Sequence, residues 1–387
     1  MSWRHQLPVS STITAGSLVR AIGPALLGGA GARDILRGDL QRAFGANNVA
    51  LTDSGTSALV LALRATTRPN GVVALPAYAC VDIGAAAIFA QLRVRLYDID
   101  PVTLSPDLAS VSRVLGAGVD AIVVAHLYGY PANVPGVAAL AAAHGVKVIE
   151  DAAQGAWGKL LETRLGAFGP LSVLSFGRGK GMTGGGGGAL LGIDAEESEI
   201  IEQSIASLRA PKSGVRTLAV TEAQYLLGRP SLYSIPSAIP GLHLGETIYH
   251  AAHDPRAISA ASASLVRDAL ARADADLAVR RAHAEELERV VARTTELSAI
   301  RAIPGSKAGF LRLPVRIADA RAERPALGVV RGYPKTLAEL TELQGSLLGD
   351  EQLSGSRELA RSLVTLPTHA LVSERDLSAL SVWISGR

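Results

Sequence analysis

The chain has 387 residues, 48% of them hydrophobic, and a formal net charge of +3. This length provides core for two or three domains, or for one large domain with a smaller partner. No basic run alternates with aromatic residues, so nucleic-acid binding is not indicated. Cys80 is the only cysteine, which excludes an intrachain disulfide and fits a reducing compartment. No segment reads as a membrane span or a secretory signal, so we expect a cytoplasmic protein that does not bind membranes.

Strands and helices alternate through the first half of the chain. Short apolar runs predict strands at 49–52, 72–75, 94–97, 121–125, 146–151, 171–176 and 189–193. The segments between them predict helices at 39–44, within 53–63, and at 81–89, 108–114 and 137–143. This alternation predicts an α/β fold with a mostly parallel central sheet covered by helices on both faces. Ligands of such sheets bind at the carboxyl ends of the strands.

The second half of the chain is less regular. A helix is predicted at 196–208, followed by a mixed stretch rich in proline and glycine at 217–249, which we interpret as an oligomer contact. Residues 259–291 predict one long amphipathic helix with Arg280, Arg281, Glu285 and Glu286 on the solvent side. We expect a large domain over residues 1–245 and a small α+β domain over 246–387.

One histidine pair in this half raises the question of a metal site. His250, His253 and Asp254 lie close together in sequence but have no further ligand cluster beside them. This pattern favours a solvated helix end, and we predict no metal.

A glycine-rich loop with one lysine follows strand 171–176. Lys180 is one of six lysines against thirty-two arginines. A lysine in a confined loop can bond covalently to a carbonyl carbon or lose its proton, which an arginine does not readily do. A P-loop is excluded because Leu174 and Gly181 replace its required glycine and hydroxyl residue. A dinucleotide fingerprint, from Gly179 to Gly184, and a mobile surface loop are the remaining alternatives.

Other polar residues fall where predicted strands end. Asp151 follows an apolar strand, and a lone carboxylate there is costly unless a cation such as a protonated pyridine nitrogen lies close. Its alternative role is a helix N-cap. Residues 53–57 place a glycine and hydroxyl groups at a helix start, which suits a bound phosphate and an ordinary N-cap equally well. Tyr78 and His126 lie at or just after two further strand ends.

Together these motifs resemble the DegT/DnrJ/EryC1/StrS family of aminotransferases. These are fold-type I enzymes that use pyridoxal phosphate and mostly aminate nucleotide-linked keto-sugars. The most specific part of the resemblance is the pair Glu150-Asp-Ala-Ala-Gln154 and Ser175-Phe-Gly-Arg-Gly-Lys180. Further similar segments occur along most of the chain, at 54–59, 75–78, 97–100, 126–129, 187–188, 333–335 and 366–369.

The resemblance implies a role for each of these residues. Lys180 would hold the cofactor covalently and then move a proton, Asp151 would pair with the pyridine nitrogen, and Gln154 would lie near the ring hydroxyl. The phosphate would be held by Thr56, by the backbone of Gly55 and Ser57, and by Ser175. Relatives that act as sugar dehydratases have a histidine in place of this lysine, so Lys180 argues against that activity.

The sequence departs from the family pattern at three places. Cys80 stands where the family usually stacks an aromatic ring on the cofactor, so we expect Cys80 or Tyr78 to lie against it. No asparagine follows Asn133, although the family commonly sends one to the partner subunit's phosphate. The family's substrate-holding loop near the amino terminus is not evident at 27–39.

The resemblance implies a homodimeric aminotransferase with its active site at the subunit interface. Its amino donor would be an amino acid, glutamate or glutamine, and its acceptor a keto or aldehyde group. A nucleotide-linked keto-sugar of polysaccharide or specialised-metabolite biosynthesis is the first candidate acceptor. The alternatives are a lyase or carbon-bond-forming enzyme that uses the same cofactor, and a cofactor-free regulatory or binding relative.

Overall fold

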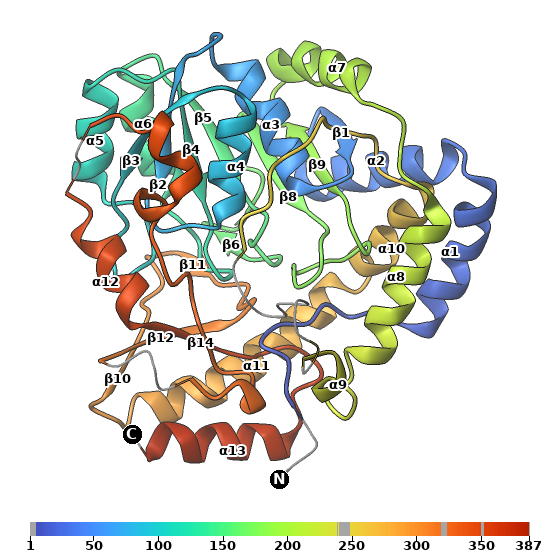
Figure 1. Cartoon of the computed structure of the whole chain (residues 1–387), viewed down its shortest axis with the longest axis vertical. Coiled ribbons are helices and arrows are strands. Elements are labelled where there is room, and N and C mark those ends of the chain that lie inside the picture. The colour runs from blue at the N-terminus through green and yellow to red at the C-terminus, as the bar shows by residue number, and fades with distance from the viewer. Residues whose placement is uncertain (1–4, 238, 240–247, 319–322, 350–351, 387) are drawn as a thin grey trace.

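The computed structural model describes residues 5–237, 239, 248–318, 323–349 and 352–386 (Figure 1). A seven-stranded sheet, in the order β1-β9-β8-β5-β4-β2-β3, forms its centre, and every strand except β9 runs in the same direction. The predicted α/β fold with a mostly parallel sheet is confirmed. The strands are β1 (Asn48–Thr52), β2 (Val72–Pro76), β3 (Arg93–Tyr97), β4 (Ala121–Ala125), β5 (Lys147–Asp151), β8 (Leu171–Ser175) and β9 (Gly188–Gly192).

Helices cover both faces of this sheet, as its buried, apolar strands require. Helix α3 (Gly55–Thr66) packs on β1, β5, β8 and β9. The other covering helices are α2 (Gly31–Phe44), α4 (Val81–Phe89), α5 (Leu108–Gly116), α6 (Val134–Ala142) and α7 (Ser198–Ser207). Two apolar clusters result, one containing Leu75 and Ile149, the other Leu51 and Phe176.

A second sheet forms a smaller unit near the carboxyl terminus. Its order is β10-β12-β14-β13, and all neighbouring strands are antiparallel. Helices α11 (Ala273–Val291) and α13 contribute to its own apolar core. The elements are β10 (Leu297–Ala299), β12 (Leu313–Ile317), β13 (Val330–Arg331), β14 (Leu363–Leu366), α12 (Ser354–Ser362) and α13 (Glu374–Ser385). The predicted boundary between residues 245 and 246 lies outside the described residues.

A three-stranded sheet adjoins this unit. It comprises β6 (Lys159–Leu160), β7 (Thr163–Arg164) and β11 (Ser306–Lys307), in the order β11-β6-β7.

The prediction of a mixed stretch at 217–249 was partly wrong. Helix α8 (Gly214–Leu227) occupies its beginning, because the first proline of this region is Pro230 and the residues before it favour a helix. A short helix, α9 (Ser234–Ser237), follows. Helix α1 (Ala15–Leu27), which was not predicted, packs against α8 (Figure 1).

The prediction of a single helix at 259–291 was also wrong. Two helices are present, α10 (Ala260–Leu270) and α11 (Ala273–Val291), and the helix breaks at Arg272, whose φ is −106° and ψ is 0°. The break lets α10 pack on α1 and α2, while the far end of α11 packs in the smaller core. Arg280 is buried, contrary to its predicted place on the solvent side. Its guanidinium donates hydrogen bonds to the carbonyl oxygens of Gly309 (2.9 Å) and Ala156 (2.8 Å).

No helix in the described part of the chain is both long and apolar enough to span a bilayer.

Candidate active site

A small cavity of about 50 Å³ lies where β4, β5 and β8 end, together with the first turn of α3. Seven of the predicted site residues line it: Gly55, Thr56, Cys80, Asp151, Gln154, Ser175 and Lys180. The structure therefore brings together residues that are up to 125 positions apart, from Gly55 to Lys180, at the edge of the sheet where ligands were expected.

The loop that carries Lys180 is closed at its base. The N–H of Phe176 donates to the carbonyl of Gly187 (2.8 Å), and the N–H of Gly184 donates to the carbonyl of Phe176 (2.9 Å). Gly179 adopts a φ of +71°, which few residues other than glycine tolerate, and Ser11 donates a hydrogen bond to the carbonyl of Lys180. These contacts hold the lysine at the end of β8 and do not match a mobile surface loop.

The turn that opens α3 lies against the end of β8. A Cβ atom on Gly55 would come within 2.7 Å of the Cβ of Ser175, so only glycine allows this approach. Ser54 caps the helix by accepting from the N–H of Ser57 (3.0 Å), and the hydroxyl of Ser57 donates to Asp53 (2.7 Å). Ser57 therefore braces the turn, whereas Gly55, Thr56 and Ser175 face the cavity.

Asp151 is buried at the end of β5. One carboxylate oxygen accepts from the N–H of Ala153 (2.9 Å). Burial raises the pKa of Asp151, and the Ala153 N–H, Lys180 and His126 oppose that rise. A carboxylate in this position gains stability from a cation in the cavity, as the sequence suggested.

His126 and Glu150 form a buried pair beside Asp151. His126 lines the small cavity, accepts from the N–H of Ala132 at Nδ1 (2.9 Å), and therefore carries its proton on Nε2, which lies 2.8 Å from Glu150. Burial alone would raise the pKa of Glu150, but its hydrogen bonds outweigh burial and hold that pKa below its usual value. Its other donors are the backbone N–H groups of Gly166, Phe168 and Gly169 and the hydroxyl of Ser172. The sequence showed His126 at a strand end but gave no sign of this pairing.

Tyr78 does not line the small cavity. This differs from one of our two expectations, that either Cys80 or Tyr78 replaces the aromatic ring that the family usually stacks on the cofactor. Its hydroxyl is buried, lies 3.1 Å from that of Tyr128 and accepts from the N–H of Tyr333 (3.0 Å). Burial raises the pKa of Tyr78 to about 12. In the described part of the chain, Cys80 and Tyr333 line the cavity instead, and Tyr333 also accepts a hydrogen bond from the side chain of Gln154.

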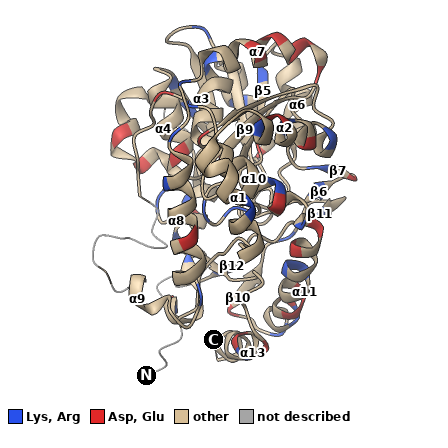
Figure 2. Cartoon of the chain, turned by 90° about the vertical axis from the view of Figure 1, so that its right-hand side faces the viewer, with Lys and Arg blue, Asp and Glu red and all other residues tan. Residues whose placement is uncertain are grey.

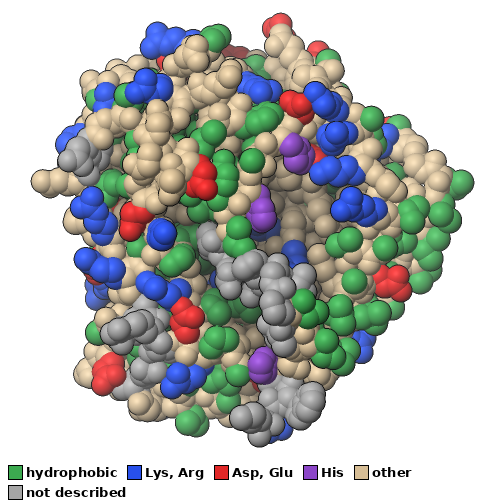
Figure 3. All heavy atoms as spheres, viewed as in Figure 1, with side chains coloured by type: hydrophobic (Ala, Val, Ile, Leu, Met, Phe, Trp, Pro, Cys, Tyr) green, Lys and Arg blue, Asp and Glu red, His purple; other side chains and the backbone are tan. Residues whose placement is uncertain are grey.

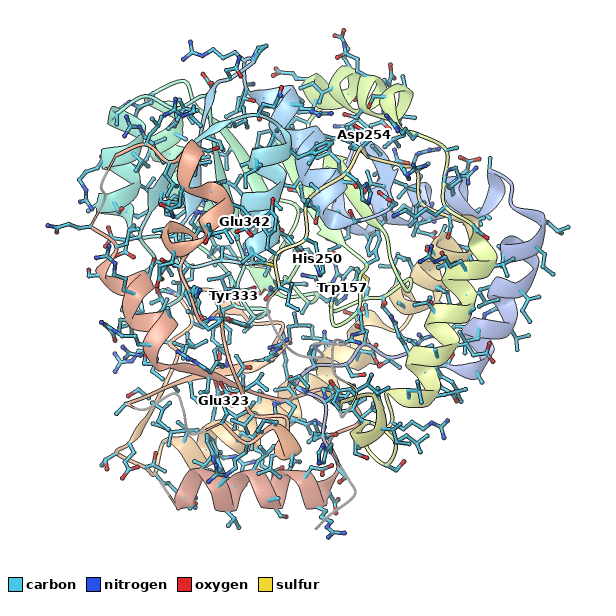
Figure 4. All side chains as sticks on the ribbon, viewed as in Figure 1. Trp157, His250, Asp254, Glu323, Tyr333 and Glu342 are labelled. Atoms are coloured by element: carbon cyan, nitrogen blue, oxygen red, sulfur yellow. The ribbon has the colours of Figure 1, made fainter. Side chains whose placement is uncertain are left out.

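A much larger cavity, of about 1190 Å³, adjoins the small one. Cys80, Asp82, Gln154, Lys180 and Tyr333 line both. The face in Figure 3 is hollowed at its centre, and Tyr333 and His250 lie in the middle of the molecule in Figure 4. Besides the residues that it shares with the small cavity, its walls include residues 7–13, α8 with 228–236, residues 311–312 and 331–333, and residues 369–371. Sequence reasoning missed residues 7–13 because they carry no motif.

The three residues considered for a metal are engaged elsewhere. His253 lies 3.3 Å from the ammonium of Lys212 and 3.5 Å from Asp53, and Asp254 pairs with Arg209 at 2.5 Å. His250 lines the larger cavity. Within the described ranges, no group of three potential ligands is placed to hold a metal ion.

The model of the DegT/DnrJ/EryC1/StrS aminotransferase family matches residues 36–378. The chain belongs to this family. The match extends through the cavity-lining strand ends of the large sheet and through the smaller sheet. It agrees with the resemblance expected from the sequence.

Two curated relatives match over a shorter region. A UDP-N-acetyl-3-dehydro-alpha-D-glucosamine 3-aminotransferase of Acidithiobacillus ferrooxidans is 34% identical over 40% of this chain and 42% of its own length. An L-glutamine:2-deoxy-scyllo-inosose aminotransferase of Micromonospora echinospora is 34% identical over 39% of this chain and 36% of its own length. The matching region thus spans less than half of either relative.

Solved structures resemble the whole chain in fold. The aminotransferase TlmJ of Streptoalloteichus hindustanus has a TM-score of 0.77 at 21% identity, covering 98% of this chain and 97% of its own. The 3-amino-5-hydroxybenzoic acid synthase structure has a TM-score of 0.77 at 20% identity, covering 99% of this chain and 98% of its own. These likenesses support the fold class.

Proposed function

We propose that this protein is a pyridoxal-phosphate-dependent aminotransferase whose cofactor is held by the residues around the small cavity and extends into the adjoining larger one. The observation that carries the proposal is the convergence of Lys180, Asp151 and the Gly55 turn on that cavity. A lysine supplies the covalent anchor, a carboxylate the partner for a pyridine nitrogen, and a helix start the phosphate site. Three separate chemical requirements of one cofactor are met at one place.

The residues of the cavity fit this cofactor physically. Asp151 is buried and accepts a hydrogen bond from the N–H of Ala153, so a protonated ring nitrogen would offset the cost of its burial. Gly55 leaves the start of α3 open where a side chain would collide with Ser175. The bound cofactor supplies an electron sink for a carbanion at the substrate's α-carbon.

The chain's own residues would then orient and protonate the substrate. Lys180 lines both cavities, so its amine can accept a proton from a substrate held in the larger cavity and its ammonium form can return that proton. Gln154 is fixed by the N–H of Tyr128 (3.0 Å) and by its bond to Tyr333, which leaves it oriented beside the cofactor. Cys80 takes the place of the stacked aromatic, since Tyr78 lies outside the cavity.

For the reaction, we propose amino transfer from glutamate or glutamine to a keto group on a sugar or cyclitol. The two curated relatives are named for acceptors of these kinds, and one is named for L-glutamine as donor. The larger cavity has room for an acceptor of this size. A nucleotide-linked keto-sugar is the first acceptor to test.

We further propose a homodimer with the site at its interface. Helices α1 and α8 present exposed apolar side chains, among them Val19 (66% exposed), Leu26 (69%) and Leu27 (87%). Figure 2 shows few charged side chains along α1. Val220 and Leu227 of α8 are both exposed and part of the cavity wall, so a second copy on this face would help to close the cavity. The single thiol of Cys80 supports a cytoplasmic location.

The test is the half-reaction with the amino donor alone. Purified holoenzyme mixed with glutamine or glutamate should lose its yellow colour and release the corresponding 2-keto acid in a one-to-one ratio with the cofactor. A lyase would keep its colour through many turnovers and consume its substrate without an acceptor. A chain that takes up no pyridoxal phosphate would contradict both and leave a cofactor-free relative.

A further inference from the structure

Two arginines in the wall of the larger cavity have no carboxylate partner in the described part of the chain. Arg312 directly precedes β12 and is half-buried. Its guanidinium makes one long hydrogen bond, 3.5 Å to the hydroxyl of Thr365. Arg331, on β13, donates to the carbonyl of Ala360 (2.8 Å), while its buried Nε has no hydrogen-bond partner. Both line the cavity.

A buried guanidinium nitrogen without a partner, such as the Nε of Arg331, is costly, and proteins normally pair such groups. Burial lowers the pKa of Arg312, and the neighbouring tyrosine hydroxyls only partly oppose the effect. Among the described residues that line the cavity, Asp82 is the one carboxylate, against the cations of Arg178, Lys180, Arg229, Arg312 and Arg331. The cavity therefore carries an excess of positive charge facing its interior.

The position of Arg312 connects this charge to the proposed cofactor site. Its backbone N–H donates to the carbonyl of Tyr128 (3.4 Å), and the N–H of Tyr128 in turn donates to Gln154. Arg312 also acts electrostatically on Tyr333, which lines both cavities, and on Tyr233, on which Arg178 acts as well. A molecule that reacts at Lys180 and extends into the larger cavity would thus meet Arg312 close to its reacting end.

We propose that Arg312, assisted by Arg331, forms an oxyanion subsite that holds a carboxylate or phosphate group of a substrate. The proposal rests on the proposed function, because it places this anion on the molecule that reacts at Lys180. Arginine suits the task, since its planar guanidinium binds carboxylate and phosphate oxygens through two parallel hydrogen bonds. The anion comes from the amino-acid donor or from the diphosphate of a nucleotide-linked acceptor.

The test is isothermal titration calorimetry of the holoenzyme with two unreactive probes, glutarate and inorganic pyrophosphate. Arg312→Gln should weaken binding of at least one probe by about tenfold or more, the loss expected for a charge-assisted hydrogen bond. Arg312→Lys keeps the charge but lacks the planar guanidinium. Its affinity for the probe should lie between the affinities of the wild type and of Arg312→Gln. The control is Arg316→Gln on the adjoining strand β12, because Arg316 pairs with Glu358 (2.6 Å) and does not line the cavity.

The pattern of loss identifies the source of the anion. If Arg312→Gln loses affinity for glutarate alone, the subsite binds the donor's carboxylate. If it loses affinity for pyrophosphate alone, the subsite binds a nucleotide-linked acceptor. If it loses affinity for both probes, the subsite accepts either oxyanion. Unchanged affinity for both probes in a folded Arg312→Gln holoenzyme overturns the subsite, as does absence of binding by the wild type.

Calorimetry detects the anion whether or not amino transfer occurs. Binding that depends on Arg312, in a chain that transfers no amino group, would contradict the proposed function alone. Amino transfer without such binding would contradict the subsite alone.

Discussion

The two adjoining cavities are built in different ways. The small cavity is formed by strand ends and one helix start of a single sheet, and its residues belong to short sequence motifs. The larger cavity also includes segments far from these motifs in the sequence, among them residues 7–13, α8 and 311–312. In the first, the buried carboxylate of Asp151 accepts from the N–H of Ala153, whereas Arg312 and Arg331 in the wall of the second have no carboxylate partner among the described residues. This difference fits the proposal that the cofactor is held at the small cavity and the substrate in the larger one.

The largest effect should follow from removing the small cavity's lysine. Lys180→Ala should abolish turnover and covalent cofactor binding, because no other described lysine lines either cavity. The measurement is the absorbance spectrum together with donor turnover. Lys147→Ala is the matched control, since Lys147 lies at the amino-terminal end of β5 and the cavity lies at the carboxyl end of the same strand. Normal turnover by Lys180→Ala would refute the site.

Asp151→Asn should leave the cofactor bound but lower turnover by about 10³-fold. A close ion pair at an effective dielectric constant of 20 is worth about 4 kcal/mol, which corresponds to that factor. The check is kcat for the half-reaction alongside cofactor content after dialysis. Turnover within tenfold of the wild type would remove Asp151 from its proposed role.

Arg280 ties the loop after β5 to the segment before β12. Its guanidinium binds the carbonyls of Ala156, in the loop after β5, and Gly309, close to Arg312. Arg280→Met should destabilise the fold by about 3 kcal/mol, because two buried carbonyl groups lose a charged donor. Urea unfolding measures the change. The control is Arg289→Met, on the exposed side of the same helix, which should lower the free energy of unfolding by less than about 0.5 kcal/mol. Equal losses for the two variants would place Arg280 outside the core.

The smallest effect concerns His369, which ties residues 7–13 to the larger cavity. Its Nε2 donates to the carbonyl of Leu7 (2.9 Å), and burial lowers its pKa from 6.5 to about 4. Between these values the unfolded chain binds a proton that the folded chain does not, so stability falls as the pH falls. From pH 7 to pH 5 the loss should be about 2 kcal/mol.

Urea unfolding at the two pH values measures this loss, and His369→Gln should reduce it. An unchanged pH dependence in that variant would show that His369 does not titrate as described.

The sequence predicted the sheet and the small cavity well because both depend on local patterns. Apolar runs mark buried strands, and strand ends of a parallel sheet meet at one edge, so Asp151 and Lys180 could be placed together. The long helix at 259–291 failed because tertiary packing, not helix propensity, breaks it at Arg272. Arg280 was misplaced because amphipathic patterns assign charged residues to solvent, whereas here two carbonyl groups satisfy the guanidinium.

The larger cavity could not be predicted for a similar reason. Arg312 and Arg331 look like ordinary surface charges in sequence, and only the pairing of β12 and β13 with β14 brings them to one wall. The resemblance assigns the backbone of Ser57 to the phosphate, and the structure adds that its N–H donates to Ser54 and its hydroxyl to Asp53. Contacts of this kind depend on the folded chain.

The most direct test of the account locates the lysine that holds the cofactor. Purified holoenzyme is reduced with borohydride, which fixes pyridoxal phosphate to its lysine, then digested and analysed by mass spectrometry. The account predicts one modified peptide, carrying the cofactor on Lys180. Modification of any of the other five lysines, or no modified peptide from a yellow protein, would contradict it.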